Sequence, residues 1–497
     1  MPLPRNLYAG YPSTVVYGEK VAGKTKGKKP RNHLIWGDWI TVNGKEGDWW
    51  QVAARGTDGW VHEDSVQEER VLEVNFIDVG QGDGCHIVTP KDRHILIDAG
   101  AESNMYRFLR WRFRGFKKTF TFESAIITHP DKDHYGGFRR IFEEPKVKID
   151  TVYHNGIVER VAAKRNARLG PRPRDPGNKV FYLTGLCPDL GSLKALVGQA
   201  AKRGKKRYPN LMHMAATEGR VQDMRMLSAE DGHLPGYDPA KPLTIQVLGP
   251  VGEPDPAGKP RLRWFKDVGK TKNGHSVILK LVYDKVTCLL GGDLNTESED
   301  YLLEHYTGLA QPPKSAEDET MTVSIARHVF ECDCAKACHH GSPHFRNIFL
   351  RAVNAAATVV SSGDEESYAH PRPDALGALG KYGRGSRPLI FSTELARSTK
   401  DSIKQPHLLR QDLVKKAKAI DAASTSADKD KALKRYKDAL RQLERSVARY
   451  GMINLRSDGE KVLIAQKLEK QRSAGARWDI HLLEPGPDGR LRSPGPH

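Results

Sequence analysis

The alternation of apolar and polar residues divides the chain into stretches of different character. Residues 37–67 read GDWITVNGKEGDWWQVAARGTDGWVHEDSVQ, in which apolar and polar residues alternate between short turns of Gly with Lys or Asp. A two-residue period between glycine turns is typical of short antiparallel strands. We therefore predict a small β-barrel over residues 1–70.

After residue 70 the pattern changes to short apolar runs separated by helical stretches. The segments VLEVNFIDVGQGDGCHIVTP and RHILIDAG predict two strands with a glycine turn between them, MYRFLRWRF predicts a helix, and SAIITHP predicts another buried strand. Strands that alternate with helices indicate α/β layering. We assign this core to residues 71–396.

Other segments interrupt or follow this core. Residues 155–240 are rich in Arg, Lys, Gly and Pro, which predicts a basic, partly helical insertion. Residues 397–450 carry apolar residues at helical spacing among many opposite charges, which predicts two helices or a helical hairpin. Residues 451–485 predict a β-hairpin that closes the core, and residues 486–497 predict a disordered tail.

The composition excludes several classes of protein. Of the 497 residues, 38% are hydrophobic and 28% are charged, as in globular rather than disordered proteins. Six Cys are too few for a disulfide scaffold, and no run approaches the ~18 apolar residues of a membrane span. The first residues contain no apolar signal sequence. We expect a cytoplasmic protein without a membrane partner.

The charge balance favours an anionic partner. Lys and Arg number 79 against 61 Asp and Glu, which gives a formal net charge of +18. A surplus of this size attracts nucleic acids, nucleotides or acidic surfaces, although it also serves solubility alone.

A cluster of metal-binding residue types follows the apolar run that ends at residue 127. The segment THPDKDHYGG places His129, Asp131, Asp133 and His134 within six positions. Imidazole suits Zn, Fe or Ni, and carboxylate suits Mg or Mn. The two glycines that follow permit a tight turn into the next helix. We predict that a loop at a strand end directs these four side chains towards divalent ions.

The same segment resembles the H-x-[HD]-x-D-H metal motif of the metallo-β-lactamase fold. The chain further resembles the hydrolase domain of ComEC-type competence proteins and their free-standing relatives, through FIDVGQGD at 76–83, LLGGDL at 289–294, ACHHGS at 337–342 and YAHPRP at 368–373. This resemblance implies an α/β protein built as an αββα four-layer sandwich, with the helical insertion as an addition near the C-terminus.

The N-terminal barrel resembles a bacterial SH3-like domain. The residues that carry this resemblance are GD at 37–38, GDWW at 47–50 and GWV at 59–61. It implies a module that docks a partner, and the alternative is a barrel that only packs on the main domain.

The resemblance implies a ligand set for two divalent metal ions, Zn or Mn. The expected assignments are His129 and Asp131 at the first ion, Asp133 and His134 at the second ion, Asp293 as a bridge, and His340 completing the second site.

His275 is an open case among the expected ligands. Many metallo-β-lactamase enzymes supply another His before the bridging Asp within a G-H-[ST] segment, and KNGHSVILKL places His275 in that position. The alternatives are a metal ligand, a hydrogen-bond donor behind a ligand, and a bystander. Without His275, the first site has only His129, Asp131 and Asp293.

Other polar residues are expected near the ions. The resemblance implies that Asp98 anchors the motif loop by hydrogen bonds and that Asp83 orients ligands or water, in a catalytic role. His370 either contacts a phosphate and donates a proton, or shapes its loop. His339 is expected behind the ligands or at a strand end.

The cysteines at positions 332, 334 and 338 do not have the paired CxxC spacing of a structural zinc site. Strand alternation predicts that they pack on one face of the core as small apolar residues.

Two closely spaced metal ions activate water for hydrolysis of phosphodiesters, β-lactams or thioesters alike, so the fold alone does not select the reaction. The carboxylate-rich ligands, the basic chain and the resemblance to a domain implicated in cutting DNA strands favour phosphodiesters. We expect a nuclease that acts on DNA through a metal-activated hydroxide, with Asp133, Asp83 and His370 as catalytic residues.

Two alternatives remain open. The first is a phosphodiesterase for cyclic or signalling nucleotides. The second is an effector in a bacterial defence or DNA-uptake assembly, which a protein partner activates through the SH3-like barrel and residues 400–450.

Overall fold

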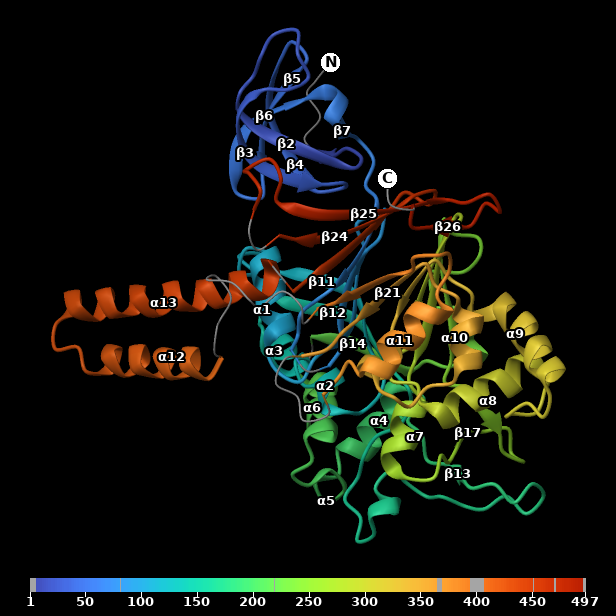
Figure 1. The fold of residues 1–497 in the computed structure, drawn as a ribbon. Helices are drawn as coiled ribbons and strands as arrows, with labels where there is room; N and C mark the ends of the chain where they lie inside the picture. Colours follow the sequence, from blue (N-terminus) through green and yellow to red (C-terminus); the bar gives the residue numbers. More distant parts are fainter. Residues whose placement is uncertain are drawn as a thin grey trace.

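A computed structural model describes residues 6–80, 82–218, 220–363, 369–393, 406–449, 451–468 and 471–494. An N-terminal barrel sits on a larger body of two sheets with helices on their outer faces, and a helical hairpin projects from one side (Figure 1). The predicted fold class is confirmed.

The N-terminal domain is one curled antiparallel sheet of order β3-β2-β6-β5-β4-β1-β7. Its elements are β1 (Asn6–Ala9), β2 (Ser13–Glu19), β3 (Lys28–Ile35), β4 (Trp39–Glu46), β5 (Trp49–Ala54), β6 (Thr57–His62), the 3-10 turn η1 (Glu63–Ser65) and β7 (Val66–Gln67). The alternating apolar side chains, such as Val16, Leu34 and Val52, meet inside the curl and are fully buried there. The barrel predicted from the two-residue alternation of apolar residues is therefore present in the structure.

The first large sheet has the order β14-β12-β11-β10-β9-β8-β23-β24-β25-β26. Its strands are β8 (Leu72–Phe76), β9 (Gly84–Val88), β10 (His94–Ala99), β11 (Phe120–Ile127), β12 (Val147–His154), β14 (Val221–Met226), β23 (Ile453–Ser457), β24 (Val462–Lys467), β25 (Trp478–Pro485) and β26 (Leu491–Arg492). Its outer face carries α1 (Asn104–Arg112), α3 (Phe138–Glu143), α4 (Leu190–Val197) and α6 (Arg207–Thr217).

The second sheet has the order β15-β18-β19-β20-β21-β22. Its strands are β15 (Leu243–Gly249), β18 (Ile278–Tyr283), β19 (Val286–Leu290), β20 (Cys334–Lys336), β21 (Ala357–Val360) and β22 (Leu389–Ser392). Helices α8 (Thr296–Thr307), α9 (Ala316–Phe330) and α10 (Asn347–Val353) pack on its outer face, and α11 (Pro373–Tyr382) lies beside α10.

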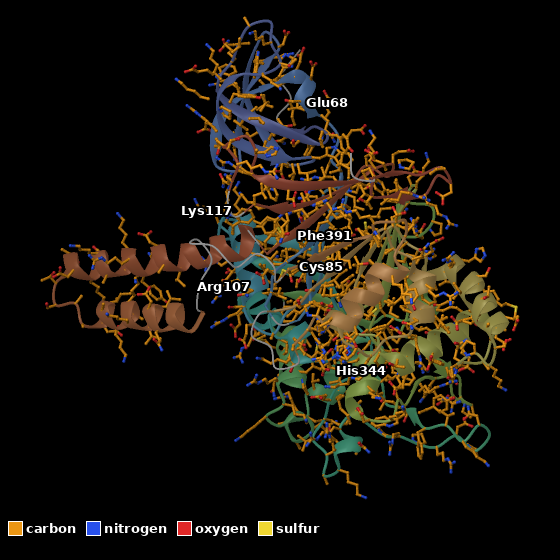
Figure 2. All side chains as sticks on the ribbon, in the orientation of Figure 1. Glu68, Cys85, Arg107, Lys117, His344 and Phe391 are labelled. Atoms are coloured by element: carbon orange, nitrogen blue, oxygen red, sulfur yellow. The ribbon has the colours of Figure 1, made fainter. Side chains whose placement is uncertain are left out.

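The two sheets share one apolar core. Ile87 and Ile95 from the first sheet meet Leu279 and Val359 from the second. Cys85 and Phe391 lie in the same layer (Figure 2). Burial of such side chains between two sheets is the main stabilising contribution in a layered fold, and it leaves the strand ends free to carry polar residues.

The basic segment at 155–240 contributes more to the core than its composition indicates. It contains α4, α6, the short α5 (Ala200–Arg203), the 3-10 turns η2 (Arg165–Ala167) and η3 (Ala229–Asp231), and β13 (Tyr182–Leu183). It also supplies β14, which pairs with β12 at the edge of the first sheet. An edge strand buries few of its side chains, so it needs few apolar residues. The sequence of β14, VQDMRM, therefore does not stand out as a strand. Strand β13 joins β17 (Pro260–Arg263) and β16 (Glu253–Pro254) in a small third sheet.

The C-terminal strands return to the start of the core. Strand β23 pairs antiparallel with β8, and β24 and β25 extend the sheet beneath the barrel (Figure 1). Trp478 packs with Trp36 of the barrel, and its Nε1 donates to the carbonyl oxygen of His33 (2.9 Å). The sequence predicts disorder over residues 486–497, whereas Leu491 is buried and β26 pairs with β25.

The helical insertion forms α12 (Pro406–Asp421) and α13 (Ser426–Arg449). The two helices run side by side and project away from the sandwich, with the C-terminal part of α13 beside α1 (Figure 1). Within the described residues, no helix combines the length and apolarity needed to span a membrane.

Glu299 on α8 makes the stability of the fold sensitive to pH. Its carboxyl is fully buried, and burial raises its pKa to about 8. Because this pKa lies above the ordinary value of 4.5, the folded state holds the proton more tightly, and stability falls as pH rises from about 4.5 to about 8. We expect Glu299→Gln to match the wild type near pH 5 and to exceed it at pH 8.5, by at most about 5 kcal/mol in urea unfolding.

The matched control is Glu297→Gln on the same helix. Lys266 and Lys270 lower the pKa of Glu297 to about 2 against the opposing effect of burial, so this substitution should lose stability at high pH instead. A stability difference for Glu299→Gln that stays constant between pH 5 and pH 8.5 would contradict the assignment.

Candidate metal centre

The motif loop connects β11 to α2 (Lys132–Tyr135) and is held by the end of β10. Asp98 accepts hydrogen bonds from the backbone N–H of Thr128 (2.9 Å), from Thr128 Oγ1 (2.7 Å) and from His134 Nδ1 (2.7 Å). The structure thus places Asp98 as an anchor of the loop.

The two glycines after the motif act through close packing rather than through a turn. Both have helical backbone angles, and a Cβ on Gly136 or Gly137 would lie 2.2 Å or 2.1 Å from a backbone oxygen of residues 99–101. Only glycine allows the start of α3 to approach the end of β10 this closely.

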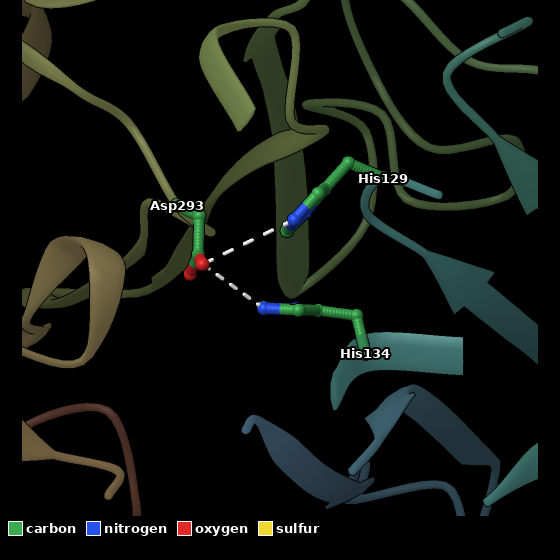
Figure 3. A group of neighbouring side chains, drawn as sticks. All are labelled: His129, His134 and Asp293. Carbon is green, nitrogen blue, oxygen red and sulfur yellow. Dashed lines mark ion pairs between the residues drawn. The ribbon is translucent and has the colours of Figure 1, made fainter. Parts of the chain in front are cut away.

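Asp293 lies at the centre of a group of imidazoles. It follows β19, and its Oδ2 lies 3.1 Å from Nε2 of His134 and 3.9 Å from Nε2 of His129 (Figure 3). The Nε2 of His340 lies 3.2 Å from the same oxygen. Asp133 Oδ2 is 3.6 Å from His340 Nε2. Residues from three distant stretches of sequence therefore meet at one point.

The other ring nitrogen of each imidazole is engaged, which directs its Nε2 at this centre. His134 Nδ1 donates to Asp98, His340 Nδ1 donates to the carbonyl oxygen of Ser361 (2.9 Å), and His129 Nδ1 lies 3.3 Å from Ser276 Oγ. Fixing the orientation and tautomer through the second nitrogen is the usual arrangement for histidine ligands of metal ions.

The donor atoms fit a divalent cation. Ligands about 2.1 Å from one ion are separated by about 3.0–3.5 Å, and the separations around Asp293 are close to this range. His129 Nε2 and Asp293 Oδ1 are buried and have no hydrogen-bond partner among the described residues. An unpartnered buried donor or acceptor is costly, and such atoms are typical of a site that binds a ligand or an ion.

The electrostatics of the group also suit a cation. Burial lowers the pKa of His129 well below its usual value, so its imidazole is neutral and can bind a metal ion. Burial acts in the same direction on His134 and His340, but Asp293 outweighs it and raises the pKa of both. A metal ion would displace those protons, so its affinity should rise with pH.

Asp83 reaches the centre from the loop after β8 and is paired with a buried lysine. Lys336 Nζ contacts Asp83 Oδ2, donates to the carbonyl oxygen of Gly292 (2.7 Å) and lies 3.6 Å from Asp293 Oδ1. Asp83 Oδ1 is 3.2 Å from His340 Nδ1. Sequence reasoning missed Lys336, although a lysine inside the apolar strand CAKA was a usable signal.

Asp131 forms an ion pair with a second lysine, Lys272. Lys272 lies on α7 (Val268–Gly274), and its Nζ contacts Asp131 Oδ1 and lies 3.3 Å from Glu159 Oε1. Asp131 Oδ2 remains 3.7 Å from His129 Nε2. Burial opposes the charge on Lys272, but Asp131 and Glu159 outweigh it and raise its pKa.

The structure does not bring His275 into this group. Its Nε2 donates to the carbonyl oxygen of Arg263 (2.7 Å), and its ring stacks on Phe265, so it cannot serve as the expected ligand in this orientation. The next residue enters instead, because Ser276 Oγ contacts His129 and accepts from the backbone N–H of Asp293 (3.0 Å).

His370 and His339 flank the centre. The His370 ring lies 6.3 Å from the His340 ring and 5.8 Å from the His339 ring, between centroids. His339 Nε2 is 4.0 Å from Asp293 Oδ2. His339 and His340 both have positive φ (48° and 55°), a strained conformation that is concentrated at functional sites.

The three cysteines pack in the core but not on one face. Cys334 lies between the two sheets, whereas Cys332 and Cys338 contact the helices outside the second sheet. Strand β20 begins only at Cys334, so strand alternation does not extend to the other two.

Comparisons with known proteins agree with this architecture. Residues 25–69 match the model of the Variant SH3 domain family. ComE operon protein 3 of Bacillus subtilis (strain 168) is 24% identical in an alignment of 327 positions that covers 62% of this chain and 31% of that protein. The chain thus spans about a third of the length of this relative. Both resemblances noted from the sequence are confirmed.

Two solved structures match this chain with low overall similarity. The metal-dependent hydrolase Tm1679 of the beta-lactamase superfamily is 10% identical with a TM-score of 0.29, over 65% of this chain and 95% of that one. The metallo-beta-lactamase SMB-1 is 15% identical with a TM-score of 0.24, over 54% and 76%.

Proposed function

We propose, from the similarity to ComE operon protein 3 and from the metal centre, that this chain is a metal-dependent phosphodiesterase and specifically a nuclease that acts on DNA. The observation that carries the proposal is the convergence of His134 Nε2 and His340 Nε2, from distant segments of the chain, on the buried Oδ2 of Asp293 (3.1 and 3.2 Å).

Each residue of the centre has a distinct task in this proposal. A divalent ion, Zn or Mn, would supply activation of the attacking water and neutralise charge on the phosphate. Asp133, His134, Asp293 and His340 would hold it, while Asp98 and Ser361 keep the imidazoles aligned. His370, whose ring lies 6.3 Å from the His340 ring between centroids, would deliver a proton to the departing oxygen.

The surroundings of the centre support a polyanionic substrate. Glu159 links Lys272 at the centre to Lys206 at the start of α6, with 3.9 Å between Lys206 Nζ and Glu159 Oε2. The same basic segment exposes Arg165 and Arg168 around η2. In this proposal, these Lys and Arg side chains would contact successive phosphates of the substrate.

The first test is a substrate panel with metal-loaded protein. Single- and double-stranded DNA, RNA, cyclic nucleotides and bis(p-nitrophenyl) phosphate are incubated with Mn or Zn, and products are measured. We expect DNA cleavage that Asp133→Ala abolishes while circular dichroism shows an unchanged fold. Turnover that persists in the folded Asp133→Ala variant would remove the proposed mechanism.

Salt dependence separates a nuclease from an enzyme for small nucleotides. With three phosphate contacts, affinity for DNA should fall roughly 40-fold between 50 and 200 mM salt, whereas KM for bis(p-nitrophenyl) phosphate should change little. Replacing Arg165 and Arg168 with alanine should reduce the slope by up to about 2 without changing hydrolysis of the small substrate. A cyclic nucleotide cleaved with salt-independent KM, and DNA left intact, would favour the small-nucleotide alternative.

The projecting hairpin favours a second candidate function, an effector switched on by a protein partner. Helices α12 and α13 extend beyond the sandwich, and Val414 on α12 is 51% exposed (Figure 1). Purified protein that binds metal ions but cleaves nothing on the panel would support this candidate over an autonomous nuclease.

A further inference from the structure

We propose that the ammonium group of Lys272 takes the place of a second metal ion, so that this chain holds a single divalent cation. The ligands of that cation are Asp133, His134, Asp293 and His340. This inference rests on the proposed function, because it defines how many ions the same centre uses.

Asp131 is the residue on which the number of ions depends. Its motif position would make it a ligand of the first ion, but its Oδ1 contacts Lys272 Nζ. The Lys272 side chain is only 12% exposed and is held on its other side by Glu159. An ammonium ion buried between two carboxylates is a fixed positive charge, and a divalent ion next to it would be repelled.

The half of the centre near His129 then has too few ligands for an ion. Without Asp131, the partners of His129 are Asp293 and His134, and the other half of the centre uses both of them. His275, which would add a donor of its own, is turned to the carbonyl oxygen of Arg263. His134 Nδ1 is bonded to Asp98, so its one remaining nitrogen can bind a single ion, and His129 has too few separate donors to form a second site.

The other half has a full set of donors. His134 Nε2 and His340 Nε2 lie 3.3 Å apart, each within 3.2 Å of Asp293 Oδ2, and Asp133 Oδ2 is 3.6 Å from His340. Among the described residues, the groups of donor atoms that fit one ion draw on these four residues together with His129, Asp83 and Asp98, and none of the groups includes Asp131. The centre is therefore asymmetric, with an ion on one side and a lysine on the other.

Metal stoichiometry tests this directly and without an activity assay. Protein is dialysed to equilibrium against excess Mn, and bound Mn per chain is measured by inductively coupled plasma mass spectrometry. We expect one Mn per wild-type chain and two per chain in Lys272→Met, which frees Asp131 to join His129 and Asp293. Electron paramagnetic resonance should show an isolated Mn ion in the wild type and a coupled pair in the variant.

The matched control is Lys270→Met on the same helix. Lys270 pairs with Glu297 outside the centre, so its loss removes the same charge and should leave one Mn per chain. If Lys272→Met does not fold, Asp131→Asn serves as a second variant, and it should keep one Mn because Asp131 is not a ligand.

Two results would overturn the inference: a wild type that binds two Mn at saturation, or a folded Lys272→Met that still binds one. A drop in Mn content for Asp131→Asn would also contradict it. Wild type that binds one Mn but cleaves no nucleic acid would refute the proposed nuclease while leaving the ion count intact, so the two failures can be told apart.

Discussion

Replacing Asp293 with asparagine should abolish metal binding and reduce hydrolysis at least about 10³-fold, which corresponds to about 4 kcal/mol of lost transition-state stabilisation. The Nε2 atoms of His134 and His340 both face Asp293 Oδ2 (3.1 and 3.2 Å), and the amide that replaces this carboxylate carries no charge. The measurement is kcat/KM on DNA or bis(p-nitrophenyl) phosphate together with metal content.

The control for Asp293→Asn is Asp300→Asn on α8. Asp300 forms a partly exposed ion pair with Arg346 (2.5 Å) away from the centre. This variant should keep full metal content and activity. If Asp293→Asn were folded and retained both metal and turnover, the assignment of Asp293 as the central ligand would be wrong.

Glu73→Gln should produce the largest loss of stability, about 3–5 kcal/mol, because it leaves buried guanidinium groups without a carboxylate. Glu73 on β8 lies 2.8 Å from Arg112, 3.1 Å from Arg70 and 3.3 Å from Arg456. Arg456 on β23 is only 1% exposed. The substitution should lower the midpoint of urea unfolding.

Glu460→Gln provides the comparison for Glu73→Gln. Glu460 pairs with Lys285 on the surface (2.7 Å), and exposed pairs of this kind contribute at most about 1 kcal/mol. The double variant Glu73→Gln, Arg456→Met should recover part of the loss, because it removes one of the uncompensated charges. Equal effects of Glu73→Gln and Glu460→Gln would show that the buried cluster does not stabilise the fold.

The Glu73–Arg456 contact also explains how the fold accepts the helical insertion. Strand β23 follows α13 and pairs with β8, so the C-terminal end of the insertion leads into the first sheet.

The sequence by itself determined the layered fold and the main components of the centre. A strand or helix with one buried face repeats its apolar residues every two or every 3.6 positions. This spacing can be read from a short stretch of sequence. The run THPDKDH directly after an apolar strand likewise places His129, Asp133 and His134 at a strand end, where side chains from neighbouring loops converge.

Only the tertiary structure decided which charged and metal-binding side chains contact one another at the end of that strand. Lys272 contacts Asp131 and Lys336 contacts Asp83 over long separations in sequence, and no local pattern specifies such pairs. The turn that directs His275 to Arg263 and brings Ser276 to His129 depends on packing against Phe265. Donor types can be read from residue identities, but the position of each charge relative to the others is set by the packing of distant segments.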